Sequence, residues 1–265
     1  MKRIVIMGAT SGIGLMVARN LASSGMKVGV AGRKTEVLRK LKEEYPDNVE
    51  YETIDITRAD ATRLLRLLID RLGGMDTYFH ISGIGYENTA LDPGKELATL
   101  ETNVTGFARM TGYAFRYFRD NNGGHGHIAA ITSVAGTNGI GRLASYSSSK
   151  CFDQCYLRAL NQLATIEHLD IKFTDIRPGW VRTPLLFDDR DYPMTMQLPY
   201  AARRIIKAVR RRNRVKVIDW RWNIVVGLWR LIPNRLWVRL PVKVDSIASP
   251  AQAHEHREEI DAEKI

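Results

Sequence analysis

The chain has 265 residues, and 45% of them are hydrophobic, so it can bury a large core without a disulfide or a metal to stabilise it. The formal net charge is +10, but the excess is local: residues 203–243 hold thirteen Lys and Arg and one acidic residue, Asp219. The first apolar run, residues 4–7, is shorter than the roughly 7–15 residues of a signal-peptide core. No run reaches the roughly 18 uncharged apolar residues of a spanning helix, so we expect a cytoplasmic protein.

Short apolar runs alternate with longer amphipathic segments along the first 218 residues. The apolar runs predict strands at residues 4–7, 27–31, 49–54, 76–81, 127–132, 171–176 and 215–218. The amphipathic segments predict helices at residues 12–24, 35–45, 58–71, 96–118, 145–167 and 199–212. This alternation is typical of parallel strands joined by right-handed crossovers. We therefore expect an α/β fold with a doubly wound, parallel, seven-stranded sheet of Rossmann type.

The two cysteines, Cys151 and Cys155, lie four residues apart on a predicted helix. That geometry suits a disulfide poorly, and free cysteines are most often core residues. We expect two buried thiols in a reduced, intracellular protein. The sequence shows no metal-ligand spacing, so no metal site is expected.

A glycine-rich turn follows the first strand and opens the first helix. Its glycines, Gly8, Gly12 and Gly14, allow a tight turn and let a pyrophosphate approach the backbone. The free N–H groups at the helix start attract the negative charge of that pyrophosphate. In this strand–turn–helix context the spacing predicts a dinucleotide site. The expected contacts from the turn are Gly8, Thr10, Ser11, Gly12, Ile13 and Gly14.

The end of the second strand indicates which dinucleotide binds. Proteins that bind NAD usually carry an acidic residue there to hold the ribose 2′-hydroxyl. This chain has Gly32, followed by Arg33 and Lys34. A guanidinium can bind a 2′-phosphate through two hydrogen bonds, so we expect NADP rather than NAD. The alternative is that Arg33 is an ordinary exposed residue at a helix start.

A second motif combines a serine with a tyrosine and a lysine four residues apart. Ser133 lies in the run ITSVAG, and Tyr146 and Lys150 lie in YSSSK. Residues i and i+4 of a helix share a face. A carbonyl that accepts a hydride needs a proton; a free phenol has a pKa of about 10, and a nearby ammonium favours its phenolate. Tyr146 is therefore the predicted acid/base, Lys150 the charge that tunes it, and Ser133 a donor to the substrate oxygen.

Together these motifs resemble the common single-domain branch of the short-chain dehydrogenase/reductase family, over roughly residues 1–215. The resemblance implies a fourth catalytic residue, Asn103 in TNVTG, which orders a water that relays protons to Lys150. It also implies a homodimer or homotetramer that pairs the long helices containing Asn103 and Tyr146. The further cofactor contacts that it implies are Asp55, Ile56, Ser82, Gly83, Tyr146, Lys150, Pro178, Gly179, Val181 and Thr183.

The chain departs from the family after the fourth strand. The family's Asn-Asn-Ala-Gly is here His80, Ile81, Ser82 and Gly83. The missing Asn removes the stabilising hydrogen bond usual there. We expect His80 to be satisfied by the backbone rather than to carry protons.

The segment after Pro178 and Gly179 covers the substrate in this family, and here it is apolar. Its large residues are Trp180, Leu185, Leu186, Phe187, Met194 and Met196. The segment predicts a hydrophobic carbonyl or alcohol as substrate, such as a 3-keto-sphingoid base, a steroid or a long-chain β-keto lipid, and hence a role in lipid metabolism. The alternatives are an epimerase or dehydratase of the same fold, or a non-catalytic NADP-binding protein at a membrane surface.

Residues 1–218 are expected to form the catalytic domain, and residues 219–265 a basic, aromatic, helical C-terminal extension with a loosely docked polar tail from His254. Tryptophan and arginine together are typical of a helix on an anionic membrane surface, although packing over the substrate or in a subunit interface explains the pattern equally well. No recognised nucleic-acid module accompanies the basic run, so nucleic acid is not an expected partner. The interleaved residues are Trp220, Arg221, Trp222, Trp229, Arg230, Arg235, Trp237 and Arg239.

Overall fold

The computed structural model describes residues 3–183, 185 and 192–242. Its core is one parallel sheet of seven strands in the order β3-β2-β1-β4-β5-β6-β7. The order reverses between β1 and β4, which is the point where ligands bind in doubly wound sheets. The predicted Rossmann-type fold is thus confirmed. The strands are β1 (Arg3–Met7), β2 (Lys27–Gly32), β3 (Val49–Thr53), β4 (Thr77–His80), β5 (His125–Ile131), β6 (Asp170–Pro178) and β7 (Val215–Ile218).

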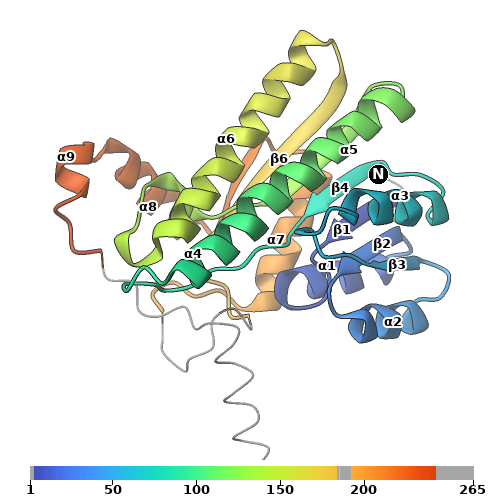
Figure 1. The fold of residues 1–265 in the computed structure, drawn as a ribbon, viewed down its shortest axis with the longest axis horizontal. Helices are drawn as coiled ribbons and strands as arrows, with labels where there is room; N and C mark the ends of the chain where they lie inside the picture. The colour runs from blue at the N-terminus through green and yellow to red at the C-terminus, as the bar shows by residue number, and fades with distance from the viewer. Residues whose placement is uncertain (1–2, 184, 186–191, 243–265) are drawn as a thin grey trace, which may run out of the picture.

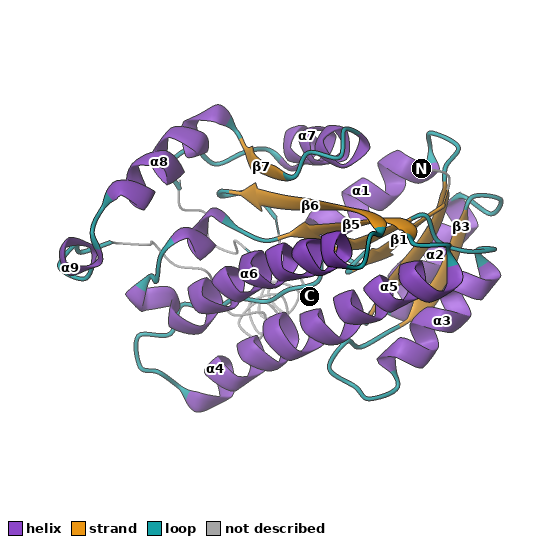
Figure 2. Ribbon diagram, turned by 90° about the horizontal axis from the view of Figure 1, so that it is seen from above, coloured by secondary structure: helices purple, strands orange, loops and turns teal. Residues whose placement is uncertain are grey.

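Helices cover both faces of the sheet (Figures 1 and 2). One face packs against α1 (Gly12–Ala22), α2 (Thr35–Glu44) and α7 (Leu198–Arg210). The other packs against α3 (Ala61–Arg71), α5 (Phe107–Asn121) and α6 (Ala144–Ile166), and α4 (Pro93–Leu100) contacts α6. Short 3-10 turns, η2 (Val134–Thr137) and η3 (Gly141–Leu143), lead from β5 into α6.

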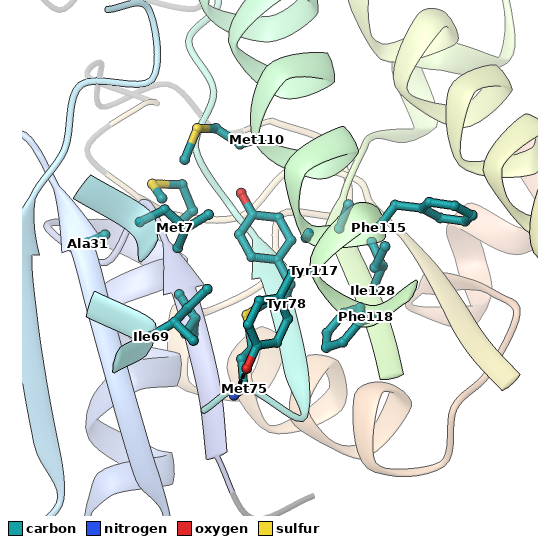
Figure 3. Packing of buried hydrophobic residues seen from close by; sticks show 14 of the residues in the cluster. Met7, Ala31, Ile69, Met75, Tyr78, Met110, Phe115, Tyr117, Phe118 and Ile128 are labelled. Atoms are coloured by element: carbon teal, nitrogen blue, oxygen red, sulfur yellow. Dashed lines mark hydrogen bonds between the residues drawn. The ribbon is translucent and has the colours of Figure 1, made fainter. Parts of the chain in front are cut away.

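The central strands are buried on both faces, as parallel strands between two helix layers must be. On the α3–α5 side, Tyr78, Phe118 and Ile69 interlock in a cluster in which each is at most 1% exposed (Figure 3). Burying a side chain of this size stabilises the fold by roughly 1.5–3 kcal/mol. This packing fixes the ends of the strands, and therefore the side chains that follow them.

One expected helix differs in detail. The segment predicted at residues 96–118 starts earlier, at Pro93, because Asp92 caps it by accepting a hydrogen bond from the Lys95 N–H (2.9 Å). It is also interrupted by a π-helical turn, η1 (Glu101–Gly106), between α4 and α5. Asn103 lies inside this turn.

The expectation of buried cysteines is wrong: Cys151 and Cys155 are both exposed free thiols. The buried side of α6 is formed by Asp153, Leu157 and Leu160 instead. These recur at helical spacing against the core, which leaves the cysteines on the outer side.

The C-terminal part continues past the sheet as α8 (Trp220–Leu231) and α9 (Asn234–Trp237). Both lie on the side to which the β6 arrow points, beyond the carboxyl ends of the strands (Figure 2). Asp219 caps α8 by accepting a hydrogen bond from the Arg221 N–H (3.0 Å). Among the described residues, no helix is both long and apolar enough to cross a membrane. The tail from His254 lies outside the described residues.

Candidate active site

The glycine turn lies where β1 and β4 meet, and it leaves no room for side chains. Gly8 has a φ of +97°, and a Cβ there would come within 2.5 Å of the Ser82 nitrogen. A Cβ on Gly14 would lie 1.9 Å from the Gly8 carbonyl oxygen. Both positions therefore require glycine. The resulting bare backbone at the start of α1 is what close approach of a pyrophosphate needs. The turn also carries Thr10, Ser11, Gly12 and Ile13.

The end of β2 lies against the same turn. A Cβ on Gly32 would come within 2.7 Å of Thr10 Cγ2. The next two side chains, Arg33 and Lys34, are exposed, and no ion pair holds either of them within the described residues. Two unpaired cations thus border the turn at the position where NAD-binding proteins carry an acid.

Asp55 follows β3 and faces this cationic edge. Its Oδ1 accepts hydrogen bonds from the Thr57 N–H (3.0 Å) and hydroxyl (2.8 Å). Burial raises the pKa of Asp55, but these bonds and the charges of Arg33 and Arg58 outweigh burial and lower the pKa below its usual value. Asp55 is therefore ionised and fixed. Ile56, beside it, is buried.

Asn103 joins the segment after β4 to helix α6. Its Nδ2 donates to the Ile84 carbonyl (2.7 Å) and to Ser149 Oγ (3.0 Å), and its Oδ1 accepts from the Ile84 N–H (2.9 Å). A Cβ on Gly83 would lie 3.3 Å from Lys150 Nζ and 3.4 Å from Asn103 Oδ1. The structure thus brings Gly83, Asn103 and Lys150 together.

Tyr146 and Lys150 project from the first two turns of α6. The Lys150 Nζ lies 6.0 Å from the centroid of the Tyr146 ring. That ring lies against Gly85, where a Cβ would be 2.6 Å from Tyr146 Cδ2. The two side chains therefore occupy one face, as their spacing predicts.

Ser133 lies just after β5 and is tied to α6 through the backbone. Its carbonyl accepts a hydrogen bond from Gln154 Nε2 (2.8 Å), one turn beyond Lys150. Its hydroxyl oxygen accepts from the Ala135 N–H (3.1 Å) and is free to donate its own proton elsewhere. This fixes the serine relative to the helix that carries Tyr146 and Lys150.

The sequence did not predict that Lys150 belongs to a cluster of buried charged side chains. Lys150 Nζ donates to Asp153 Oδ2 at 2.9 Å, and Arg177 Nε donates to Asp175 Oδ2 at 2.8 Å. All four residues are at most 5% exposed. The Thr132 hydroxyl, next to Ser133, donates to Asp175 Oδ1 (2.7 Å). The available signal was the charged pair Asp175 and Arg177 at the end of the strand, where the burial pattern of β6 is continuous.

His80 is buried at the end of β4, and its Nδ1 is hydrogen-bonded to the Tyr78 hydroxyl (2.9 Å), a partner the sequence did not predict. Its ring meets the edge of Phe107 with centroids 4.9 Å apart. Burial, helped by the charge of Lys150, lowers the pKa of His80 to about 3. The imidazole is therefore neutral at physiological pH, which does not suit it to carry protons.

The segment after β6 is tied at both ends. Pro178 is buried, and the Gly179 backbone lies against the Trp222 indole of α8. Val181 bridges Met196, and the Met196 N–H donates to the Trp180 carbonyl (2.9 Å). The Thr183 hydroxyl accepts from the Leu185 N–H (3.3 Å). Leu186 and Phe187 lie outside the described residues.

An apolar cluster packs against Tyr146. Its buried members are Ala135, Ile140, Leu143 and Trp237. Partly buried apolar side chains pack against these, among them Tyr146 itself. The others are Trp180, Leu185, Trp229, Ile232 and Val242. The surroundings of the tyrosine on this side are therefore apolar.

Three of the four C-terminal tryptophans face inward. Trp222 and Trp237 are buried, and the ring of Trp229 makes edge contacts with both, at centroid distances of 6.4 and 5.5 Å. Trp237 Nε1 donates to the Gly139 carbonyl (2.6 Å). Only Trp220, 67% exposed, points outward. The sequence left open whether these tryptophans contact a membrane or pack within the protein, and packing accounts for three of the four rings.

In the part of the chain that the structure describes, no group of three or more His, Cys, Asp or Glu side chains could hold a metal ion.

The candidate site consists of the glycine turn, the cationic edge and the Ser133–Tyr146–Lys150–Asn103 group, all at the carboxyl ends of the strands.

Comparison with known proteins finds relatives of this chain. A putative ketoacyl reductase of Streptomyces coelicolor is 31% identical over 194 residues, covering 71% of this chain and 74% of that protein. An uncharacterized oxidoreductase of Myxococcus xanthus is 28% identical over 240 residues, covering 88% of this chain and 93% of the relative.

Solved structures share the fold. ElxO with NADP bound superimposes with a TM-score of 0.74 at 20% identity, over 84% of this chain and 99% of that one. A variant of actinorhodin polyketide ketoreductase with NADPH gives 0.62 at 30% identity, over 69% and 72%. The family model for short chain dehydrogenases matches residues 2–192, which is more than half of the chain. The chain belongs to the short-chain dehydrogenase/reductase family, and its oxidoreductase relatives support an enzyme that acts on alcohols and carbonyls.

Proposed function

We propose that this protein is an NADPH-dependent reductase that converts the carbonyl of a hydrophobic substrate to an alcohol, or catalyses the reverse reaction. The observation that carries the proposal is the placement of Tyr146 and Lys150 beside Gly83 and Asn103, with an apolar cluster packed against the tyrosine. The family includes epimerases and dehydratases, but no contact among the described residues of the site favours them.

The residues of the cofactor site fit NADPH. The bare backbone at Gly8 and Gly14 accommodates the pyrophosphate, and Arg33 and Lys34 are the unpaired cations for a 2′-phosphate. The ketoreductase relative was solved with NADPH. The remaining contacts assigned to the cofactor are Asp55, Ile56, Ser82, Gly83, Tyr146, Lys150, Pro178, Gly179, Val181 and Thr183.

Each catalytic side chain has a distinct role. The bound nicotinamide supplies the hydride. Ser133 donates a hydrogen bond to the substrate oxygen and holds it near Tyr146, whose hydroxyl gives up the proton. The Lys150 ammonium favours the phenolate that remains. Asn103 fixes the segment at Ile84 and supports the water through which Lys150 is connected to solvent.

The apolar cluster around Tyr146 supports a lipophilic substrate. Tyr146 packs against a cluster that contains Leu143 and Trp237, and Trp180 packs against the same cluster, so a hydrocarbon bound there leaves water. Each buried methylene contributes about 0.8 kcal/mol, so affinity grows with chain length. The substrate classes proposed are a 3-keto-sphingoid base, a steroid or a long-chain β-keto lipid, which places the enzyme in lipid metabolism.

The test is NADPH oxidation by the purified protein with ketones of increasing chain length. We expect kcat/KM to rise with length and turnover to vanish in Tyr146→Phe, which keeps the ring against Gly85 but lacks the proton. Equal turnover of short hydrophilic ketones would contradict the hydrophobic substrate. Tight NADPH binding without turnover of any carbonyl would contradict the reductase and favour a non-catalytic role.

We also propose that the C-terminal extension, residues 219–265, places the enzyme peripherally on the cytoplasmic face of an anionic membrane. The supporting feature is the exposed apolar surface of α8, α9 and the residues that follow them, 238–240. It holds seven of the fourteen exposed large hydrophobic side chains among the described residues. These are Trp220, Ile224, Leu228, Leu231, Leu236, Val238 and Leu240.

Charge favours lipid over a second copy of the chain on this face. Residues 220–242 contain four arginines and no Asp or Glu, and one of the four, Arg221, is ion-paired with Asp219 at 2.6 Å. Two copies meeting here would bring like charges together, whereas anionic headgroups pair with them at about 1 kcal/mol per cation. The homodimer or homotetramer that we propose therefore uses another surface, along α5 and α6.

A further inference from the structure

Lys150 is paired with a carboxylate from its own helix. Asp153 is 0% exposed, and its Oδ2 lies 2.9 Å from Lys150 Nζ. The only other hydrogen bond of the ammonium recorded within the described residues is to the Ile131 carbonyl, at 3.4 Å. The second oxygen of Asp153, Oδ1, has no partner among the described residues. Asp153 is thus the main partner of the ammonium.

The charged groups that face Asp153 from neighbouring elements do not compete with its pairing to Lys150. On β6, Asp175 and Arg177 form their own ion pair, which is neutral overall. On β4, His80 is neutral because burial lowers its pKa to about 3. On α6 itself, Tyr146 is the remaining titratable group near Lys150. Among the described residues, Asp153 is therefore the anion nearest to Lys150 that has no other cation as a partner.

Burial alone would drive the proton off Lys150. A lysine taken out of water disfavours its charged form, and fully buried lysines lose several pKa units. In this site the charge of Asp153, with smaller contributions from Tyr146 and Asp175, more than offsets burial and raises the pKa of Lys150. Burial also raises the pKa of Asp153 itself, to about 6, so the pair is ionised at pH values well above 6.

We propose that Asp153 is a positioning residue of the reaction, which keeps the buried Lys150 protonated and fixed next to Tyr146. This inference rests on the proposed reductase function. Without the carboxylate, Lys150 loses its proton at lower pH, and the phenolate of Tyr146 then forms without a neighbouring cation. Proton transfer to and from the substrate therefore depends on a side chain that touches neither substrate nor cofactor.

The variant Asp153→Asn tests this, because an amide keeps the shape and one acceptor oxygen but removes the charge. The first readout is NMR of lysines labelled with 13C at Cε in the apo protein, with the Lys150 signal assigned by its absence in Lys150→Arg. We expect the titration midpoint of Lys150 to fall by at least about one unit. This readout does not depend on turnover, so it separates the inference from the proposed function.

The second readout is the pH profile of alcohol oxidation with NADP. The rising limb of kcat, which follows phenolate formation, should move about one unit to alkaline pH in Asp153→Asn, toward the value of a free phenol. Asp153→Glu retains the charge and should restore the wild-type limb.

A merely structural role would lower the unfolding temperature and leave both pH readouts unchanged. An unchanged Lys150 midpoint, or a limb that stays in place or moves to acid pH, overturns the inference.

Discussion

The indole of Trp222 lies directly on the backbone of Gly179: a Cβ at position 179 would come within 2.1 Å of Trp222 Nε1. Gly179 belongs to the turn that follows β6, and Trp222 to the first turns of α8. The contact fastens the C-terminal helix to the edge of the candidate active site.

Replacing Gly179 by Ala should displace Trp222 and loosen α8. We expect the free energy of unfolding to fall by about 2 kcal/mol, as in other overpacked contacts, and KM for a hydrophobic ketone to rise. The control is Gly227→Ala in α8, where a Cβ meets nothing within 4 Å. Helix propensity should make that variant more stable by about 0.5–1 kcal/mol. Equal stability of the two variants would show that the Trp222 contact is unimportant.

Replacing Arg33 by Ser should weaken binding of NADPH but not of NADH. The 2′-phosphate loses a charge-assisted partner, so we expect Kd for NADPH to rise about tenfold or more. Fluorescence titration with both cofactors checks this, and Arg63→Ser, an exposed arginine on α3, serves as control. Parallel weakening of both cofactors would mean that Arg33 contacts something other than the 2′-phosphate.

Acid should destabilise the protein through two buried histidines. Burial lowers the pKa of His80 to about 3 and that of His127 to about 4, below the ordinary 6.5. The unfolded chain therefore binds more protons, and the stability that these groups contribute above pH 6.5 is lost as pH falls. Each should cost about 2 kcal/mol between pH 6.5 and 5. Asp153 acts in the opposite sense below pH 6, because its pKa is raised.

Comparing variants isolates the histidine contribution, because the other groups cancel in the difference. Denaturant unfolding of His80→Asn should show a shallower loss of stability between pH 6.5 and 5 than the wild type. His168→Asn, at an exposed position, should match the wild type. An unchanged slope in His80→Asn would show that His80 is not held neutral.

The outer face of α8 should govern membrane binding. We expect the wild type to sediment with vesicles of phosphatidylcholine and phosphatidylserine, and less with phosphatidylcholine alone. Replacing Ile224 and Leu228 together by Asn should weaken binding at least about tenfold, since each loses most of its apolar burial. Leu97→Asn, an equally exposed leucine on α4, is the control. If the double variant instead changes only the oligomeric mass, a second copy of the chain covers this face.

The rate at which the two exposed thiols react should show whether subunits assemble through α6. Cys151 and Cys155 are on the outer side of α6, so both should react rapidly with a thiol reagent in dilute native protein. If α6 pairs between subunits as proposed, the rate should fall as the protein concentration is raised through the assembly range. Light scattering gives the mass in parallel. Assembly without any protection of the thiols would place the interface elsewhere.

The sequence was sufficient for the fold and for the positions of Tyr146 and Lys150. Both depend on local spacing: strand–helix alternation sets the sheet, and a separation of four residues on a helix puts two side chains on one face. The need for glycine at position 14 is also local, because a Cβ there would meet Gly8, six residues earlier, whereas Gly8 lies against the distant Ser82.

The features that escaped prediction depend on which helix face is buried. Asp153, three residues after Lys150, looks like half of an ordinary surface ion pair until the sheet covers it. Cys151 and Cys155 have the composition of core residues but lie outside the Asp153–Leu157–Leu160 face. Similarly, the spacing of Trp220 and Trp222 does not reveal that one ring faces out and the other in.

The π-helical turn at residues 101–106 has a consequence for how related chains are compared. Such a turn holds one more residue than the α-helical turn it replaces, and the extra residue rotates everything after it by about 100° around the helix axis. Asn103 reaches Ile84 and Ser149 from within this turn. Deleting a single residue between 101 and 106 would therefore leave the amino-acid types of the site intact and still separate Asn103 from its partners. A related chain therefore keeps this site only if it keeps both the residue types and the number of residues in this turn.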